Sequence, residues 1–179
     1  SNNTYPCNFM LVAAMNPCPC GYFGEDRCRC TDYEVLKYRQ KISGPILDRI
    51  DMQKYVHPVD FLELSSRRGT HTSQELKERV EKACSFQRQR FRSHPSIYCN
   101  VQMNASHVKT FCVLEAEGER LLASAFDRFR YSARSYHKFL KIARTFADLD
   151  QSLKIRKKDV AAALLSRDLE REQSELLVI

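Results

Sequence analysis

Residues 9–30 read FMLVAAMNPCPCGYFGEDRCRC, and residues 41–51 read KISGPILDRID. The first stretch opens with an apolar run, residues 9–15, that ends at Asn16-Pro17. A short apolar run bounded by turn residues is typical of a strand that is covered on both faces in a parallel sheet. We therefore expect a central strand over residues 9–15, with Asn16 at its carboxyl end.

Asn16 is a candidate ligand-sensing residue because of this expected position. Ligands of open α/β sheets bind beyond the carboxyl ends of the strands. A neutral amide there can orient a water molecule or a terminal phosphate without adding charge. The alternative is that Asn-Pro is only the turn that follows a strand.

The cysteines that follow have the spacing C-x-C-x7-C-x-C, and two glycines lie between the pairs. Four thiolates can close a tetrahedral zinc site, and the glycines let a short loop fold around it. The C-x-C spacing is tighter than the usual C-x2-C, so free thiols and disulfides stay open as alternatives. The candidate metal ligands are Cys18, Cys20, Cys28 and Cys30.

Arg49 lies between Asp48 and Asp51, just after Gly44-Pro45. A guanidinium held by flanking acids in a short structured segment can reach a neighbour's phosphate, where its charge stabilises phosphoryl oxygens. The alternative is an intramolecular ion pair.

Helix signals dominate the rest of the chain. The capping boxes Thr31-x-x-Glu34 and Thr72-x-x-Glu75 predict helices over about 32–42 and from 72 to His94. Residues 51–57 read as a second strand, and apolar stripes at helical spacing run from Asn104 onward. We expect a mostly helical chain: an α/β part (1–65), a helical connector (66–100) and a helical bundle (101–179).

Arg134 follows Ser132, the expected N-cap of a bundle helix. A helix N-terminus favours phosphate, and an arginine in its first turn strengthens such a site. The alternative is an ordinary surface arginine.

Composition limits the class of protein. The chain has 179 residues, a net charge of +7 and 43% hydrophobic residues, which permits a packed core. No apolar run approaches the roughly 20 residues of a membrane span, and the start lacks the features of a signal peptide. We therefore expect a cytoplasmic location. Lys and Arg gather in residues 67–92 and 128–158, which indicates either polyanion contact or solvated helix faces.

Two motifs are absent from the sequence. It has no G-x-x-x-x-G-K-[ST] loop and no apolar run ending in Asp-Glu. We therefore expect that this chain does not hydrolyse ATP alone.

In this chain order, Asn16, Arg49 and Arg134 resemble sensor 1, the arginine finger and sensor 2 of AAA+ ATPases. LVAAMNPCPCGY, CRC and KISGPILDRID, together with SARSYHKFLKIARTFADLD (132–150), are similar to the magnesium-chelatase-like competence protein ComM (YifB) family. The resemblance implies the C-terminal part of a P-loop ATPase core followed by a helical lid.

The same resemblance implies ATP and magnesium as cofactors, a hexameric ring of identical subunits, and a DNA helicase that promotes branch migration during competence. Two other functions stay open. One is the ATPase subunit of a chelatase that inserts metal into a tetrapyrrole, and the other is a non-catalytic zinc and nucleic-acid-binding module. Salt-dependent DNA binding distinguishes the helicase from the chelatase.

Overall fold

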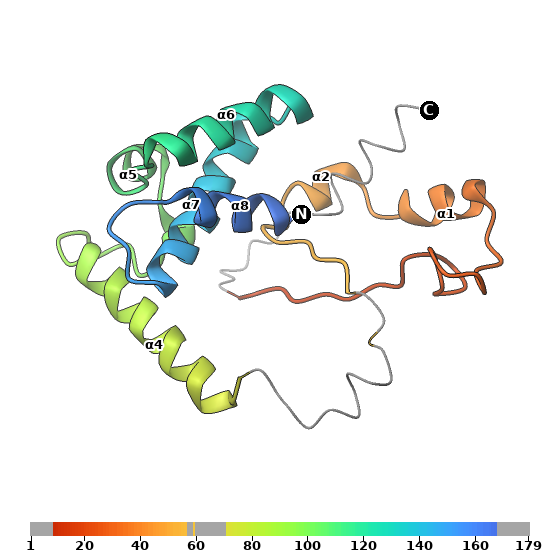
Figure 1. Ribbon diagram of the computed structural model, residues 1–179, viewed down its shortest axis with the longest axis horizontal. Helices are drawn as coiled ribbons and strands as arrows, with labels where there is room; N and C mark the ends of the chain where they lie inside the picture. The colour runs from red at the N-terminus through yellow and green to blue at the C-terminus, as the bar shows by residue number, and fades with distance from the viewer. Residues whose placement is uncertain (1–8, 57–58, 60–70, 168–179) are drawn as a thin grey trace, which may run out of the picture. The chain divides into compact units, whose positions relative to one another are not determined.

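The computed structural model describes residues 9–56, 59 and 71–167. The chain divides into two compact units, residues 1–49 and residues 50–179, and each is described by itself. Within the described ranges the regular structure consists of helices, and backbone pairing of the β type is limited to isolated bridges (Figure 1). This confirms the mostly helical character but does not show the expected parallel sheet.

The first unit contains α1 (Asp32–Arg39) and the short α2 (Gly44–Leu47). The predicted capping box at the start of α1 is confirmed. The Thr31 side chain accepts a hydrogen bond from the Glu34 backbone N–H at 3.3 Å, and the Glu34 carboxylate accepts one from the Thr31 N–H at 2.9 Å. Pro45 lies in the first turn of α2, where its missing N–H has no helical partner to lose.

Residues 9–15, predicted to be a covered central strand, form no strand in the structure. Their side chains are exposed, with Met10 at 87% and Val12 at 81%. A parallel strand takes its hydrogen bonds from neighbouring strands, and the described residues supply no such neighbour to this segment. The prediction was therefore wrong for the chain as the structure shows it.

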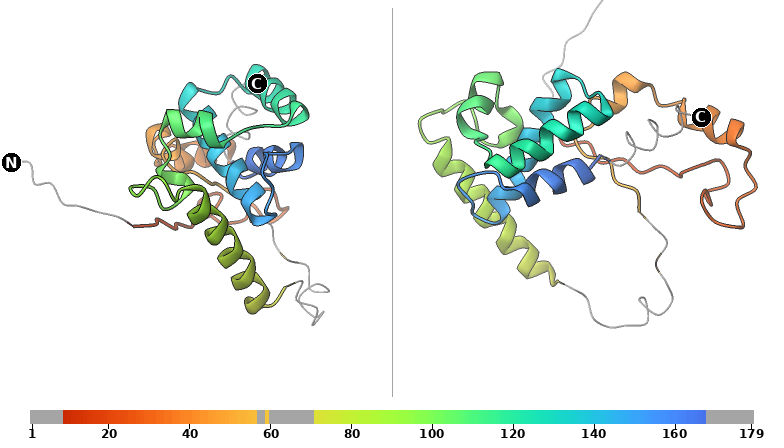
Figure 2. Two further views of the ribbon diagram at one scale, coloured as in Figure 1. Left: turned by 90° about the vertical axis from the view of Figure 1, so that its left-hand side faces the viewer. Right: turned by 45° about the horizontal axis from the view of Figure 1, so that its top comes forward.

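The second unit is a group of helices arranged around α7. Its elements are α4 (Ser73–Arg90), the 3-10 turn η1 (Asn100–Gln102), α5 (Ala105–Phe111), α6 (Ala116–Phe129), α7 (Ala133–Leu149) and α8 (Lys157–Leu165). Helix α7 packs against α8, α4, η1 and α5, while α6 packs against α8. Figure 2 shows the N-terminal half of α4 projecting beyond the other helices.

The predicted stripes of α6, α7 and α8 form the core of this unit. The buried side chains include Leu122 of α6, Phe139, Leu140 and Ala143 of α7, and Val160 and Ala163 of α8. The predicted N-cap is also confirmed, because the Ser132 hydroxyl accepts a hydrogen bond from the Ser135 N–H at 3.2 Å. The 3.6-residue periodicity thus located the part of the core that α6, α7 and α8 supply, while Ile97, Met103, Val108 and Ile155 add core contacts outside these stripes.

The predicted apolar stripe of α4 is only partly buried. Ala83 is buried, but Leu76 and Val80 are 47% and 53% exposed. They line an open hollow of about 600 Å³ between α4, α7 and α8. Phe146, Leu149 and Ala162 lie on the other side of this hollow, so the described residues leave the apolar face of the N-terminal half of α4 only partly covered.

The second predicted strand, residues 51–57, is reduced to a single parallel bridge. The Gln53 N–H donates to the Ser166 carbonyl oxygen at 2.6 Å, which pairs Gln53 with Arg167 at the end of α8. Residue 57 and the predicted boundary at 65/66 lie outside the described residues. The predicted three-part division stays a prediction. In the part of the chain that the structure describes, no helix is long and apolar enough to cross a membrane.

Candidate nucleotide-sensing residues and cysteine cluster

The Asn16 side chain is exposed and lies beside Gly21. A Cβ atom built on Gly21 lies 3.8 Å from the Asn16 Nδ2 atom, which is van der Waals contact. Gly21 has φ +85°, a conformation that side chains with a Cβ rarely adopt. The loop therefore lies beside the Asn16 amide at Gly21. The positive φ of Gly21 favours glycine at this position of the loop.

The structure brings the four predicted metal ligands together, and we call them the cysteine cluster (Cys18, Cys20, Cys28, Cys30). All four Sγ atoms lie within 4.8 Å of one another. The Sγ–Sγ distance is 3.3 Å from Cys18 to Cys20, and Cys28 lies 3.9 Å and 3.6 Å from these two. A disulfide needs about 2.05 Å, so these cysteines are free thiols in the structure.

A series of turns folds this loop back on itself. Backbone hydrogen bonds join the Gly21 N–H to the Cys18 carbonyl at 3.1 Å and the Cys28 N–H to the Glu25 carbonyl at 2.9 Å. Gly24, between the cysteine pairs, has φ +86°. The two glycines thus provide the left-handed residues that bring the second cysteine pair back to the first.

Cys20 and Cys30 have different pKa values, although both lie in the same crowded cluster of thiols. Backbone hydrogen bonds from Arg29 and Tyr22 lower the pKa of Cys20 to about 6. At Cys30 a backbone hydrogen bond involving Cys20 lowers the pKa, but desolvation and the neighbouring thiols outweigh it and raise the pKa to about 12. Cys20 is therefore the more acidic of these two thiols.

Arginines of the first unit stack on aromatic rings of the same loop. The Arg27 guanidinium lies 3.9 Å from the centre of the Tyr22 ring and also pairs with Glu25 at 2.6 Å. Arg39 of α1 lies 4.5 Å from the Phe23 ring centre and donates to the Pro17 carbonyl at 3.3 Å. The two contacts of Arg39 join α1 to the start and to the middle of the cysteine loop.

Arg49 follows the C-cap of α2, and its side chain is exposed. Its Nη1 atom donates to the Pro45 carbonyl oxygen at 2.7 Å, four residues earlier. Asp51, expected to help hold this guanidinium, forms an ion pair with Lys138 at 3.5 Å. The guanidinium is therefore oriented by the helical turn at Pro45 rather than by Asp51.

Arg134 is the second residue of α7, directly after the Ser132 N-cap and Ala133, and its side chain is exposed. This is the predicted position in the first turn of an amphipathic helix. Asn16 and Arg49 belong to the first unit and Arg134 to the second, so the structure gives the surroundings of each residue and not one assembled site.

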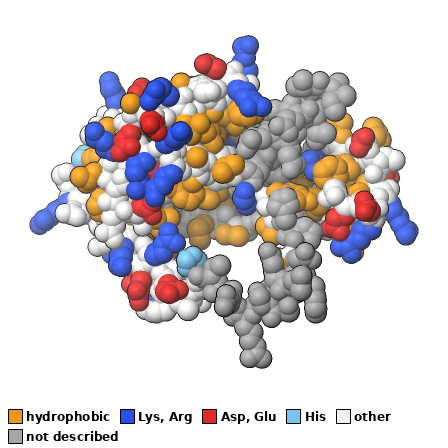
Figure 3. All heavy atoms as spheres, in the orientation of Figure 1, with side chains coloured by type: hydrophobic (Ala, Val, Ile, Leu, Met, Phe, Trp, Pro, Cys, Tyr) orange, Lys and Arg blue, Asp and Glu red, His pale blue; other side chains and the backbone are white. Residues whose placement is uncertain are grey.

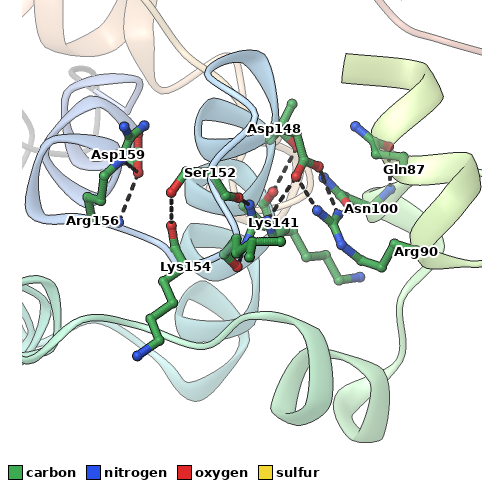
Figure 4. A network of polar contacts seen from close by, with 12 residues as sticks. Gln87, Arg90, Asn100, Lys141, Asp148, Ser152, Lys154, Arg156 and Asp159 are labelled. Carbon is green, nitrogen blue, oxygen red and sulfur yellow. Dashed lines mark hydrogen bonds and ion pairs between the residues drawn. The ribbon is translucent and has the colours of Figure 1, made fainter. Parts of the chain in front are cut away.

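A buried ionic network in the second unit was not predicted. The fully buried Asp148 carboxylate accepts hydrogen bonds from Arg90, from Asn100 Nδ2 at 2.8 Å and from Arg144 Nε at 3.0 Å. Figure 4 shows Arg90 and Asn100 pointing toward Asp148. The i,i+4 spacing of Arg144 and Asp148 is a signal for their pairing, but nothing in the sequence indicates that both are buried or that α4 contributes Arg90.

The Asp148 network and a separate set of ion pairs at Arg156 engage basic residues of the predicted polyanion-binding segments. Arg144 is fully buried, and Arg156 pairs with Asp159 at 3.0 Å and with Asp150 at 2.8 Å. On the face of the second unit drawn in Figure 3, basic and acidic side chains are interspersed. Part of the positive charge in residues 128–158 is therefore engaged in ion pairs within the chain.

Comparison with known proteins gives the family. Residues 70–167, more than half of the chain, match the family model described as magnesium chelatase, subunit ChlI C-terminal. Residues 1–64 match the model described as magnesium chelatase, subunit ChlI. The chain belongs to the magnesium chelatase ChlI family. The expected family is thereby confirmed.

Individual relatives of this ChlI-family chain include the uncharacterized protein YifB of Escherichia coli K12, 34% identical over 94% of the chain and 32% of YifB. The competence protein ComM of Haemophilus influenzae is 33% identical over 89% of the chain and 31% of ComM. The uncharacterized protein Rv2897c of Mycobacterium tuberculosis is 32% identical over 91% of the chain and 32% of its own length. The chain spans about a third of the length of these relatives.

Proposed function

We propose that this ChlI-family chain is the sensing and lid part of a ring-forming AAA+ ATPase that acts on DNA, as in the ComM type. In this proposal Asn16 is sensor 1, Arg49 is the arginine finger and Arg134 is sensor 2. ATP and magnesium bind at a phosphate loop that the present sequence does not contain. The helices of the second unit are the lid.

The position of Arg134 in an amphipathic lid helix is the observation that carries the proposal. Ser132 accepts from the Ser135 N–H at the start of α7, where first-turn N–H groups lack acceptors within the helix, and the guanidinium of Arg134 adds a full positive charge at the same helix end. A nucleotide phosphate is stabilised by both. The opposite face of α7 is anchored in the core through Phe139 and Leu140, so movement of the lid moves Arg134 with it.

Arg49 suits action on the nucleotide of an adjacent subunit. It is exposed, and its guanidinium donates through Nη1 to the Pro45 carbonyl oxygen, a single surface contact that a phosphate of a neighbouring subunit would replace. An arginine that enters a neighbour's ATP site stabilises charge on the transferred phosphoryl group. The proposal therefore requires identical subunits around a ring, each completing the site of the next.

DNA is the proposed substrate because of the ComM relative and the net charge of +7. The matched family models bear the name magnesium chelatase, which favours metal insertion as the second candidate function. Binding of DNA by the full-length protein with a steep salt dependence supports the first candidate. Absence of DNA binding at low salt supports the second.

The sensor 2 assignment is tested by Arg134→Ala in the full-length protein, with ATP hydrolysis as the readout. We expect a loss on the order of 10²-fold in the hydrolysis rate, the scale for removing one preorganised charge-stabilising donor. The exposed Arg120→Ala on α6 is the control and keeps the normal rate. Normal hydrolysis and normal nucleotide affinity in the Arg134 variant would contradict the assignment.

A further inference from the structure

We propose that the cysteine cluster binds one zinc ion, and that this ion fixes the loop beside which the Asn16 side chain lies. The metal site stands on the geometry of the first unit alone. Its consequence for nucleotide sensing rests on the proposed role of Asn16.

The spacing of the sulfur atoms fits a tetrahedral ion. With zinc–sulfur bonds of about 2.3 Å, the sulfur atoms of a tetrahedral four-thiolate site lie about 3.8 Å apart. The observed Sγ–Sγ distances of 3.3, 3.6 and 3.9 Å scatter around this value. All four sulfur atoms lie within 4.8 Å of one another, so the loop already brings the four ligands within reach of one ion.

The set of donor atoms indicates the kind of metal and its role. Four thiolates suit zinc, and they leave no coordination position for water or substrate. The ion is therefore structural and not catalytic. Cys18 is fully buried and the other three sulfur ligands are half-buried, so the site is partly shielded from solvent.

The first unit needs such a cross-link because its own core is small. In the described residues 9–49, the buried hydrophobic side chains are Cys18, Val35 and Leu47. Small units without enough apolar burial are commonly stabilised by a metal or by disulfides. The cysteines here are free thiols, and a zinc ion supplies the missing cross-link between the two ends of the loop.

The ion also acts on the candidate sensor residue. Gly21 follows the first cysteine pair directly, and it lies beside the Asn16 side chain, so that a Cβ atom at this position would be 3.8 Å from the Asn16 Nδ2 atom. A metal that fixes the positions of the cysteines also fixes the position of Gly21, which lies beside the Asn16 amide. Asn16 lies two residues before the first ligand, so the metal also restrains its backbone.

The test is the zinc content of the full chain after purification without chelators. We expect about one equivalent of zinc in the unmodified chain and in the Cys84→Ser control, which changes an exposed cysteine of α4 outside the cluster. In Cys28→Ser/Cys30→Ser we expect less than a tenth of an equivalent. Iron in place of zinc, less than a tenth of an equivalent in the unmodified chain, or full zinc in the double variant overturns the proposal.

A second readout separates loss of metal from loss of folding. In NMR spectra, removal of zinc by a chelator should shift the Asn16 side-chain amide signal and the backbone signals of residues 17–30, and readdition should restore them. Signals of α6 to α8 should stay unchanged, which shows that the lid is still folded. An Asn16 signal that does not respond overturns the link to the sensor residue. Zinc content and ATP hydrolysis are separate measurements, so failure of the ATPase proposal leaves the metal result interpretable.

Discussion

Asp148 is a single residue that connects two helices of the second unit through a buried carboxylate. Its carboxylate is fully buried and compensates the positive charges of Arg90 and Arg144, which come from α4 and α7. Removing one partner of a buried ionic group leaves an uncompensated charge, which costs more than the intact group contributes. Asp148 therefore ties α4 to α7.

We predict that Asp148→Asn lowers the free energy of unfolding by about 3–5 kcal/mol, because the buried arginines lose their counter-charge. Urea denaturation of the full chain measures this. The matched control is Asp127→Asn on the exposed face of α6, with an expected change within about 0.5 kcal/mol. Equal stability of the two variants would show that the network contributes little.

The sequence predicted the contacts within the cysteine cluster but not those of the Asp148 network. The spacing of the cysteine cluster predicted that its members lie together, because two C-x-C pairs joined by a glycine-containing loop meet by local folding. The Asp148 network depends on bringing Arg90, Asn100 and Asp148 together from separate elements. Local patterns carry no information about such contacts.

Among the elements, helices were predicted well and strands were not. The capping boxes of α1 and α4 and the N-cap of α7 appear where the sequence placed them, because they are contacts between residues three apart. The apolar run at residues 9–15 signals burial equally clearly, but a strand forms only against another strand. The same holds for the apolar face of a helix. The pattern of α4 predicts a buried face, but Leu76 lies beside an open hollow.

The capping box of α4 gives a prediction about pH. Hydrogen bonds from the backbone N–H and side chain of Thr72 lower the pKa of Glu75 below its usual 4.5. Because the pKa is lower in the folded chain, this contact adds stability that is fully present above the unfolded pKa of about 4.3. That stability is lost as the pH falls through the folded pKa.

NMR titration of the Glu75 carboxyl group measures this effect, and we expect a midpoint below the unfolded value of about 4.3. The Thr72 amide signal should follow the same curve, since this N–H donates to the carboxylate at 2.8 Å. In Glu75→Gln the Thr72 amide should no longer titrate, while in the exposed Glu81→Gln control it should. A Glu75 midpoint at or above the unfolded value of about 4.3 would contradict the capping role.

At the scale of the whole molecule, the two units carry different parts of the proposed machine. The first holds Asn16, Arg49 and the cysteine cluster, and the second holds Arg134 on a helix anchored in an ample core. The family and the lid-like helices could be predicted from sequence because their motifs are local and specific. How the units are arranged around a nucleotide depends on contacts that no local pattern encodes.

The central claim is that Arg49 completes the ATP site of an adjacent subunit, and the most direct test is ATP hydrolysis by the full-length protein carrying Arg49→Ala. We predict a fall in kcat of about 10³-fold or more with unchanged ATP affinity, the scale for losing an arginine finger. The control is Arg120→Ala, because Arg120 also donates to a carbonyl oxygen four residues earlier, at 3.3 Å. It should hydrolyse ATP normally. Normal hydrolysis by the Arg49 variant would contradict the account.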